Sequence, residues 1–245
     1  MATFVMIHGS WHGGWCFDAL RPLLAAHGHA MIAPDLPGMG SSDAELAATT
    51  LAGWGDFVAG ICRSAPAGPV ILVGHSRGGI VISEAAERAP EAIAALVYVC
   101  AILLPDGMSR SRWSQLRPRN AAFDAIILAH PSGAATTIDR AGAPTVFAQL
   151  SPPDSVRAAT ARLVAEPSAP RATPLSLSDA RYGSVPRHYI ECLHDRAIPI
   201  ADQRAMQALL PCTSVTSLAT DHSPFLSAPG ELAAALLAIA GGAAG

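Results

Sequence analysis

The chain has 245 residues, of which 51% are hydrophobic and 14% charged, so it holds enough apolar material for one large globular domain. All 16 basic residues are arginines, and the lack of lysine excludes mechanisms that need one, such as Schiff-base chemistry or a phosphate-binding P-loop. The formal net charge of -3 argues against a nucleic-acid partner. No apolar run approaches the ~20 residues of a membrane span, so we expect a cytoplasmic protein.

The five cysteines are scattered along the chain and form no Cys-x-x-Cys pair. This spacing predicts neither a zinc site nor a redox motif. Their apolar surroundings are typical of buried, reduced thiols. We therefore expect no metal and no organic cofactor.

Six short apolar segments rich in β-branched residues alternate with helical patterns, which predicts a mostly parallel α/β sheet flanked by helices. The predicted strands are 3–8, 30–34, 69–74, 96–101, 188–192 and 214–218. The predicted helices between them are 15–26, 51–64, 78–89, 201–210 and 230–240. In this architecture ligands bind beyond the carboxyl ends of the strands, so residues after each strand are the first site candidates.

A long interval between the fourth and fifth predicted strands breaks this alternation. It contains helical patterns at 121–129 and 152–165, and Ser151 is the expected N-cap of the second. An insertion of this length usually forms a lid over a binding site. The expected division is an α/β core of two segments, 1–107 and 188–245, with 108–187 between them as a helical cap.

The pentapeptide at 74–78 reads Gly-His-Ser-Arg-Gly, which is the G-x-S-x-G pattern between a predicted strand and a predicted helix. A serine in this context lies on a sharp turn with its hydroxyl exposed at the sheet edge. The N-terminus of the following helix favours negative charge beside it. The pattern therefore predicts Ser76 as a nucleophile.

A serine hydroxyl needs a base to take its proton, and the base needs a carboxylate to fix its tautomer. His222 follows the last predicted strand and is the expected base. Asp195 follows the fifth strand and is the expected carboxylate, with Asp106 after the fourth strand as the alternative. Asp221, beside the histidine, is expected to face away. The order Ser76, Asp195, His222 is that of this architecture.

The oxyanion of a tetrahedral intermediate needs two fixed N–H donors. The amide of Arg77, the residue after the nucleophile, is one expected donor. The second is expected from the glycine-rich loop after the first strand, where the amide of Ser10 is the best placed.

These residues together resemble the α/β-hydrolase superfamily over essentially the whole chain. The patterns His-Gly-x-x-His-Gly-x-Trp at 8–15, Phe-Ala-Gln-Leu-Ser-Pro-Pro at 147–153 and Asp-His-Ser-Pro at 221–224 narrow the resemblance. They are similar to the branch that contains plant methyl esterases, plant hydroxynitrile lyases and small bacterial carboxylesterases, including pyrethroid-ester hydrolases.

The resemblance implies a catalytic triad of Ser76, Asp195 and His222, with the oxyanion hole formed by the amides named above. It also implies that the insertion caps a largely apolar pocket. The expected lining residues from the cap are Trp113, Phe123, Phe147 and Leu150.

Two positions separate the esterases of this branch from its lyases. The lyases resemble one another in a threonine after the first-strand histidine and a lysine after the catalytic histidine. This chain has Gly9 and Ser223 there, and it has no lysine to stabilise a cyanide leaving group. The comparison favours a hydrolase over a hydroxynitrile lyase.

The expected function is a serine esterase that cleaves a small-to-medium carboxylic ester through an acyl-enzyme. A lactone, a thioester or a biosynthetic-pathway intermediate is the alternative substrate, and a non-hydrolytic ligand-binding protein is the alternative class. The expected partner is a small molecule, with neither membrane nor nucleic acid, and a homodimer is left open. Four arginines of the insertion are interpreted as solvated surface rather than as a site for an acidic substrate: Arg110, Arg112, Arg117 and Arg119.

Overall fold

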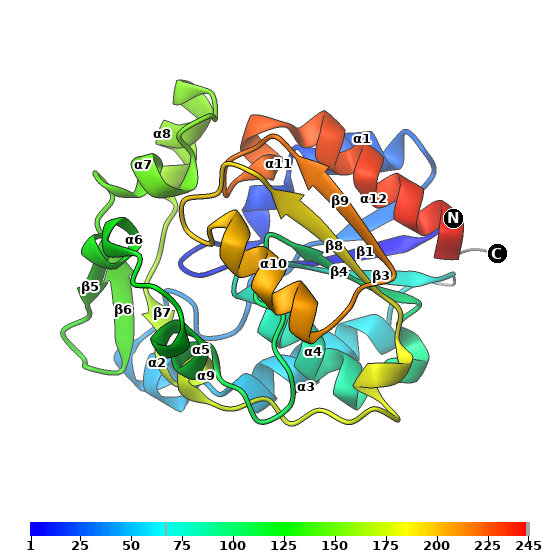
Figure 1. Ribbon diagram of the computed structural model, residues 1–245, viewed down its shortest axis with the longest axis horizontal. Coiled ribbons are helices and arrows are strands. Elements are labelled where there is room, and N and C mark those ends of the chain that lie inside the picture. Colours follow the sequence, from blue (N-terminus) through cyan, green and yellow to red (C-terminus); the bar gives the residue numbers. More distant parts are fainter. Residues whose placement is uncertain (67, 244–245) are drawn as a thin grey trace.

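A computed structural model describes residues 1–66 and 68–243. Within them, a central sheet has six strands in the order β2-β1-β3-β4-β8-β9, and every neighbouring pair is parallel (Figure 1). The strands are β1 Thr3–Ile7, β2 Ala30–Ile32, β3 Val70–His75, β4 Ala95–Val99, β8 Arg187–Cys192 and β9 Ser214–Leu218. The predicted parallel α/β sheet is confirmed.

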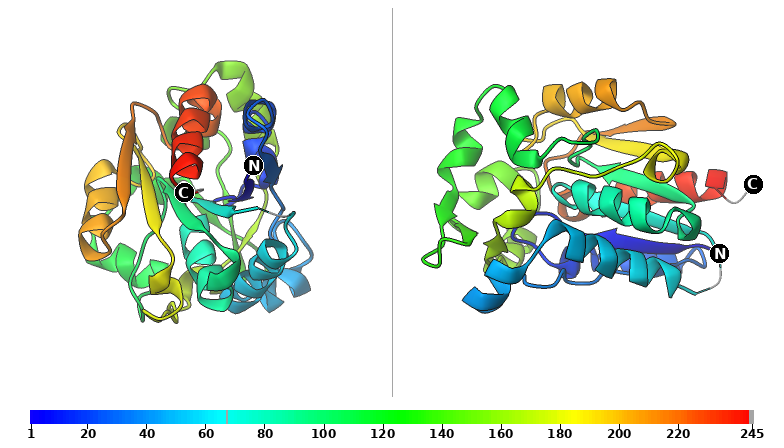
Figure 2. Two further views of the ribbon diagram at one scale, coloured as in Figure 1. Left: turned by 90° about the vertical axis from the view of Figure 1, so that its right-hand side faces the viewer. Right: turned by 90° about the horizontal axis from the view of Figure 1, so that it is seen from below.

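Helices cover both faces of this sheet, which explains why β1, β3 and β4 are apolar along almost their whole length. Phe4 and Met6 of β1 pack in one apolar cluster with α1 and α12, and the alternating Val5 and Ile7 pack in another with α3, α4 and α10. Figure 2 shows the same two layers from other sides. The covering helices are α1 Leu20–Ala25, α3 Leu51–Arg63, α4 Gly78–Arg88, α10 Ile200–Leu209 and α12 Pro229–Ala243.

The predicted helix at 15–26 is interrupted. A short 3-10 helix, η1 (Gly14–Phe17), precedes α1, which begins at Leu20. Pro22 has no amide N–H to bond the carbonyl of Asp18, and its ring clashes with that carbonyl in a continuous helix, so proline is tolerated only in the first turn of α1. Other short elements of the core are α2 Asp43–Ala48, η2 Pro90–Ala92 and α11 Pro224–Ser227.

Residues 110–172 of this interval lie beyond the carboxyl ends of the strands, opposite the N-terminus, and the rest of it runs back along the core to the start of β8 (Figures 1 and 2). The interval 108–187 is not wholly helical, because three of its segments form an antiparallel sheet in the order β5-β6-β7. Its elements are α5 Arg110–Leu116, α6 Ala121–Ala125, β5 Ile127–Ala129, β6 Ala135–Ile138, α7 Ala143–Phe147, α8 Pro153–Ala161, β7 Glu166–Pro167, α9 Ala169–Ala172 and η3 Tyr182–Ser184.

Two local predictions for this interval are wrong. The helix predicted over 121–129 ends at Ala125, because the following residues pair with β6. Ser151 does not cap α8: Pro152 occupies the N-cap, and the Ser151 hydroxyl donates to Asp221 instead. In both cases a contact with a segment distant in sequence replaces the local pattern.

The last part of the interval packs on the core. Leu175, Tyr182 and Val185 belong to the apolar cluster of α3 and α4, and the Tyr182 hydroxyl lies 3.2 Å from the Tyr98 hydroxyl of β4. Within the described residues, no helix combines the length and apolar character needed to cross a bilayer.

Candidate active site

Ser76 lies between β3 and α4 in a left-handed backbone conformation, with φ of 54°. Side chains other than glycine rarely adopt it, so the surrounding structure must hold it. The Ser76 amide donates to the Val99 carbonyl at 3.2 Å, and its carbonyl accepts from Ile102 N–H at 2.9 Å. The loop after β4 therefore fixes this turn from both sides.

Two glycines around the serine are required by close backbone approach. A Cβ atom at Gly78 would lie 2.5 Å from the Ile7 carbonyl oxygen of β1, and one at Gly74 would lie 2.8 Å from the backbone of Gly78. Such distances are shorter than van der Waals contact, so α4 packs against the sheet only without side chains here. This is the physical basis of the G-x-S-x-G pattern.

His222 follows β9 and reaches both predicted partners. Its Nε2 lies 3.0 Å from Ser76 Oγ, and its Nδ1 lies 2.7 Å from Asp195 Oδ2. All three side chains meet at the carboxyl edge of the sheet, and those of His222 and Asp195 are buried. With its proton on Nδ1, the His222 ring donates to the Asp195 carboxylate, and Nε2 is free to accept the proton of the serine hydroxyl.

Asp195 is oriented by the main chain that follows it. Its Oδ1 accepts hydrogen bonds from the amides of Ala197 and Ile198, at 2.7 and 2.8 Å. The other oxygen is thereby directed at His222. The alternative carboxylate, Asp106, is exposed and accepts from the Leu177 amide, so the structure does not bring it to the histidine.

Asp221 faces away from Ser76, toward the insertion. Its Oδ2 accepts from the Leu150 amide at 2.8 Å and from the Ser151 hydroxyl at 3.0 Å. Its Oδ1 accepts from the Ser223 amide at 3.0 Å. This buried carboxylate therefore joins the insertion to the loop that carries His222.

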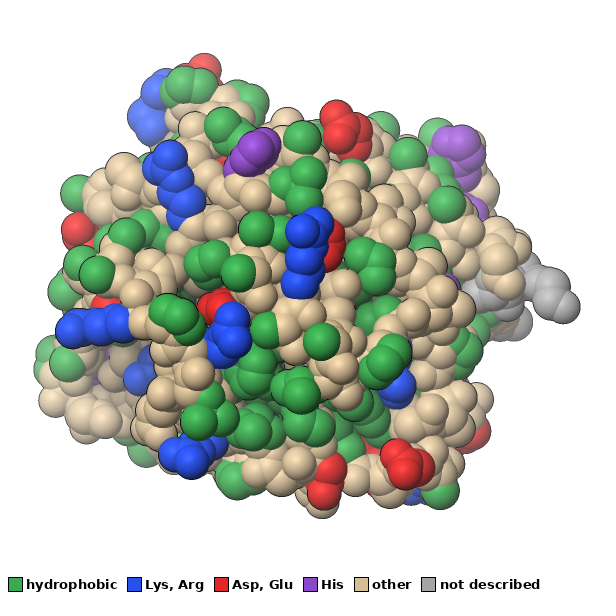
Figure 3. All heavy atoms as spheres, viewed as in Figure 1, with side chains coloured by type: hydrophobic (Ala, Val, Ile, Leu, Met, Phe, Trp, Pro, Cys, Tyr) green, Lys and Arg blue, Asp and Glu red, His purple; other side chains and the backbone are tan. Residues whose placement is uncertain are grey.

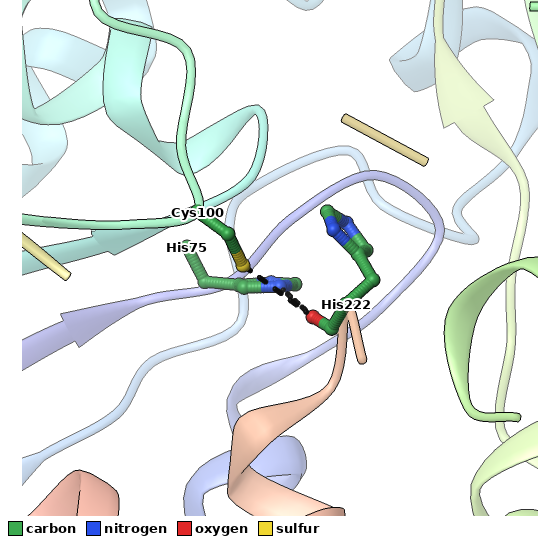
Figure 4. A group of neighbouring side chains, drawn as sticks. All are labelled: His75, Cys100 and His222. Atoms are coloured by element: carbon green, nitrogen blue, oxygen red, sulfur yellow. Dashed lines mark hydrogen bonds between the residues drawn. The ribbon is translucent and has the colours of Figure 1, made fainter. Parts of the chain in front are cut away.

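Three side chains of metal-ligating type, His75, Cys100 and His222, have ligand atoms within 4.8 Å of one another. Figure 4 shows that His75 and Cys100 instead converge on the main-chain carbonyl of His222, whose ring points elsewhere. His75 Nε2 lies 2.7 Å from that oxygen and Cys100 Sγ lies 3.6 Å from it. The group holds the main chain of His222 in place, and we assign no metal to it.

The loop after β1 presents amides to the site because its carbonyls are occupied. The Gly9 carbonyl accepts from Arg77 Nη2 at 3.0 Å and lies 2.9 Å from His8 Nδ1, and the Ser10 carbonyl lies 2.7 Å from His12 Nδ1. In the described part of the chain, neither the Ser10 nor the Arg77 amide donates to a protein acceptor. Both predicted oxyanion donors are therefore available.

The two histidines of this loop are neutral. Burial, followed by the charge of Arg77, lowers the pKa of His8 to about 3. Burial is also the main cause that lowers the pKa of His12 to about 4. Each therefore holds one proton, at Nδ1, and uses it to fix a loop carbonyl.

A buried carboxylate of the insertion joins the side chains of Ser10 and Arg77. Arg77 Nε lies 2.8 Å from Glu166 Oε1, both side chains are 2% exposed, and the same oxygen accepts from the Ser10 hydroxyl at 3.1 Å. Glu166 belongs to β7 of the insertion. The side chains of Ser10 and Arg77 thus meet on one carboxylate more than 80 positions along the chain.

Gly9 borders the nucleophile. A Cβ atom there would lie 2.8 Å from Ser76 Cβ and 3.0 Å from His75 Nδ1. A threonine at this position, as in the lyases, requires Ser76 or its neighbours to move.

Two adjoining cavities follow from this geometry. The inner cavity contains Ser76 and His222, and the larger outer cavity opens beside α5. Both are lined by Ile102, Arg110, Phe123, Ala197 and Ile198.

The four expected pocket residues lie in different places. Phe123 and Phe147 line the inner cavity. Trp113 lines only the outer cavity. Leu150 lines neither cavity, and its side chain is 52% exposed.

Sequence reasoning missed several residues of the inner cavity. Trp11 lines it and donates from Nε1 to Thr136 of the insertion, at 3.2 Å. Its place directly after Ser10 was the available signal. Ile198 follows Asp195 by three residues and could have been found in the same way. Glu166 carries no local signal, because the chain fold alone brings it to Ser10 and Arg77. The interpretation of Arg110 as solvated surface is wrong, because this side chain is partly buried and lines both cavities.

Comparison with known proteins agrees with this arrangement. A family model described as the alpha/beta hydrolase family matches residues 4–235. This chain belongs to the α/β-hydrolase family. Among related members, the pyrethroid hydrolase of Sphingobium wenxiniae is 34% identical over 96% of this chain and 86% of its own. Salicylic acid-binding protein 2 of Nicotiana tabacum is 32% identical over 97% of this chain and 96% of its own.

Solved structures of the family show the same fold. A pyrethroid hydrolase from Sphingobium faniae matches with a TM-score of 0.87 and 31% identity, over 98% of each chain. Two longer relatives from Arabidopsis thaliana carry chloroplastic methylesterase names, and this chain spans 63% and 54% of their lengths.

Proposed function

We propose that this chain is a serine hydrolase that cleaves a small-to-medium carboxylic ester through an acyl-enzyme intermediate. The observation that carries the proposal is the continuous contact from Ser76 Oγ through His222 to Asp195, at 3.0 and 2.7 Å. This is the constellation that activates a serine hydroxyl. Esterase names among the relatives support the ester as substrate class.

In the first half-reaction, Ser76 Oγ attacks the ester carbonyl carbon and His222 Nε2 takes the hydroxyl proton. The imidazolium that forms is stabilised by Asp195. The C–O bond to the alcohol then breaks, and His222 returns the proton to the leaving oxygen. Water repeats the cycle on the acyl-enzyme, which releases the acid and restores Ser76.

The carbonyl oxygen becomes negative in both tetrahedral intermediates. The amides of Ser10 and Arg77 are the proposed donors to it, at the N-terminus of α4, where the helix dipole adds to their effect. Removing one such donor typically costs about 10²–10³-fold in rate.

We also propose that the insertion 108–187 acts as the cap of the catalytic cavity. Its Arg110, Phe123 and Phe147 line the same inner cavity as Ser76. Their positions support an apolar substrate chain that lies between the insertion and the sheet edge. The length of that chain is set by how the two cavities join.

Hydrolysis of p-nitrophenyl esters from acetate to decanoate tests the proposal. We expect turnover by the wild type, with a chain-length optimum that reports the inner cavity, and background rates for Ser76→Ala. Turnover by Ser76→Ala at the wild-type rate would contradict the mechanism. An inert wild type whose Ser76 reacts with a fluorophosphonate probe would keep the nucleophile and move the search to lactones, thioesters and pathway intermediates.

A further inference from the structure

Basic side chains gather mainly on the insertion side of the face in Figure 3. Four arginines line the two cavities, and three of them have an acidic partner. The pairs are Arg77 with Glu166 at 2.8 Å, Arg117 with Asp202 at 2.7 Å and Arg119 with Asp124 at 2.8 Å. Among the described residues, no carboxylate forms an ion pair with the fourth, Arg110.

Arg110 is also the arginine placed between the two cavities, because its side chain lines both. It is the first residue of α5 and is partly buried. Its Nη1 donates to Ser114 Oγ at 2.7 Å, and its guanidinium lies 5.6 Å from the ring centre of Phe123. These contacts fix the guanidinium but use one of its five N–H donors.

The surroundings of Arg110 favour a bound anion. Burial lowers the pKa of its guanidinium, and the positive charge of Arg171, on the adjacent α9, lowers it further; the carboxylates of Glu166 and Asp124 oppose these effects without cancelling them. A negative group in the cavity would offset what remains. The four donors that Ser114 leaves free are arranged for two parallel hydrogen bonds to a planar acceptor.

We propose that Arg110 binds a carboxylate carried by the substrate, so that the chain prefers esters with a second, ionised carboxyl group. The inference rests on the proposed ester hydrolysis and names its substrate class. A singly charged carboxylate fits better than a dianionic phosphate, because the other cavity arginines are already neutralised. The ester group lies at Ser76 in the inner cavity, and the carboxylate lies toward the outer one.

The test uses pairs of methyl esters that differ only at the far end of a linear acid chain, where one has a carboxylate and the other a carboxamide. Spacers of two to eight methylene groups cover the unknown separation. At the best spacer, we expect wild-type kcat/KM to be about 10- to 100-fold higher for the carboxylate, as for hydrogen bonds to charged groups. The preference should shrink as salt is added.

Three variants assign the preference to one side chain. Arg110→Gln should bring the carboxylate-to-carboxamide ratio close to 1, and Arg110→Lys should restore part of it. Arg112→Gln is the matched control, because Arg112 lies on the same helix, is exposed and lines neither cavity. It should keep the wild-type ratio. A wild-type ratio near 1 at every spacer length, or an unchanged ratio in Arg110→Gln, would overturn the inference.

Binding measurements separate this inference from the proposed function. If the wild type cleaves neither ester and Ser76 does not react with a fluorophosphonate, ester hydrolysis fails as the function. Calorimetry with Ser76→Ala then still compares the two uncleaved esters. Tighter binding of the carboxylate that is lost in Ser76→Ala/Arg110→Gln supports the anion site, and equal binding of both esters overturns it.

Discussion

The floor of the inner cavity, formed by Ser10, Ser76 and His222, differs from its roof, formed by Arg110, Phe123 and Phe147, in how it is held. Floor residues follow strands β1, β3 and β9 of the six-stranded sheet, and contacts of their main-chain groups hold them in place. Roof residues lie on α5, α6 and α7, which are short helices outside that sheet. Chemistry is therefore assigned to the rigid part and substrate choice to the part that tolerates change.

The largest effect on activity should come from replacing Asp195, the carboxylate that contacts His222. In Asp195→Asn, the side-chain oxygen stays with the amides of Ala197 and Ile198, so the new NH₂ group faces His222 Nδ1. The histidine then carries its proton on Nε2 and cannot accept from Ser76, which should lower kcat about 10⁴-fold. Steady-state kinetics with the best p-nitrophenyl ester measures this loss of kcat.

Asp106→Asn is the matched control for that prediction. Asp106 is exposed and contacts Leu177, so its variant should stay within about twofold of wild type, as surface changes usually do. A larger loss in Asp106→Asn than in Asp195→Asn would reverse the assignment of the carboxylate.

A smaller effect, on folding free energy, is expected for the ion pair between Arg77, which follows Ser76, and Glu166 of the insertion. Glu166→Gln leaves the buried Arg77 guanidinium without its counter-charge, and breaking such a pair costs about 3–5 kcal/mol of folding free energy. Urea unfolding at pH 7 measures the change. Glu91→Gln removes an exposed partner of Arg63 and should shift the midpoint little. Equal shifts in both variants would show that the buried pair has no special role.

The last prediction concerns how the free energy of unfolding depends on pH through His8 and His12. Their pKa values are about 3 and 4 in the folded chain, against 6.5 when unfolded, so the unfolded state binds more protons below pH 6.5. The contribution of the two neutral histidines to the free energy of unfolding should therefore have its full value above pH 6.5. It should fall as pH drops, by about 1.4 kcal/mol per pH unit for each histidine.

Urea unfolding between pH 5 and 7 tests this slope. His12→Gln should have a shallower slope than the wild type, because one of the protonations that oppose folding is removed, while those of His8 and of the buried His75, whose pKa burial also lowers, remain. An unchanged slope in His12→Gln would contradict the prediction.

The central sheet and the residues that follow its strands were predicted better from the sequence than the contacts of the insertion. Ser76, Asp195 and His222 each come directly after a strand, and parallel strands end at one edge, so local patterns were enough to place them. The roof depends on contacts between segments far apart in sequence. Ser151 has the local features of a helix cap, yet its hydroxyl bonds Asp221 about 70 residues away.

Glu166 and Arg110 illustrate the same limit more strongly. No motif surrounds Glu166, and the arginine-rich run that contains Arg110 indicated solvated surface. Only the pairing of β7 with β6 and the placement of α5 bring them to the nucleophile loop. The charge of a side chain can be read from the sequence, but its partner cannot.

The hydrogen bonds of Asp221 have a consequence for the proposed entry of substrate. Lifting the segment at Leu150 and Ser151 would leave a buried carboxylate without two of its donors, and each lost donor costs about 1–3 kcal/mol. Under the proposed function, the segment at Leu150 and Ser151 would stay closed, and substrate would enter where the outer cavity opens beside α5. His222, next to Asp221 in sequence, would then stay fixed while substrate and product pass on the far side.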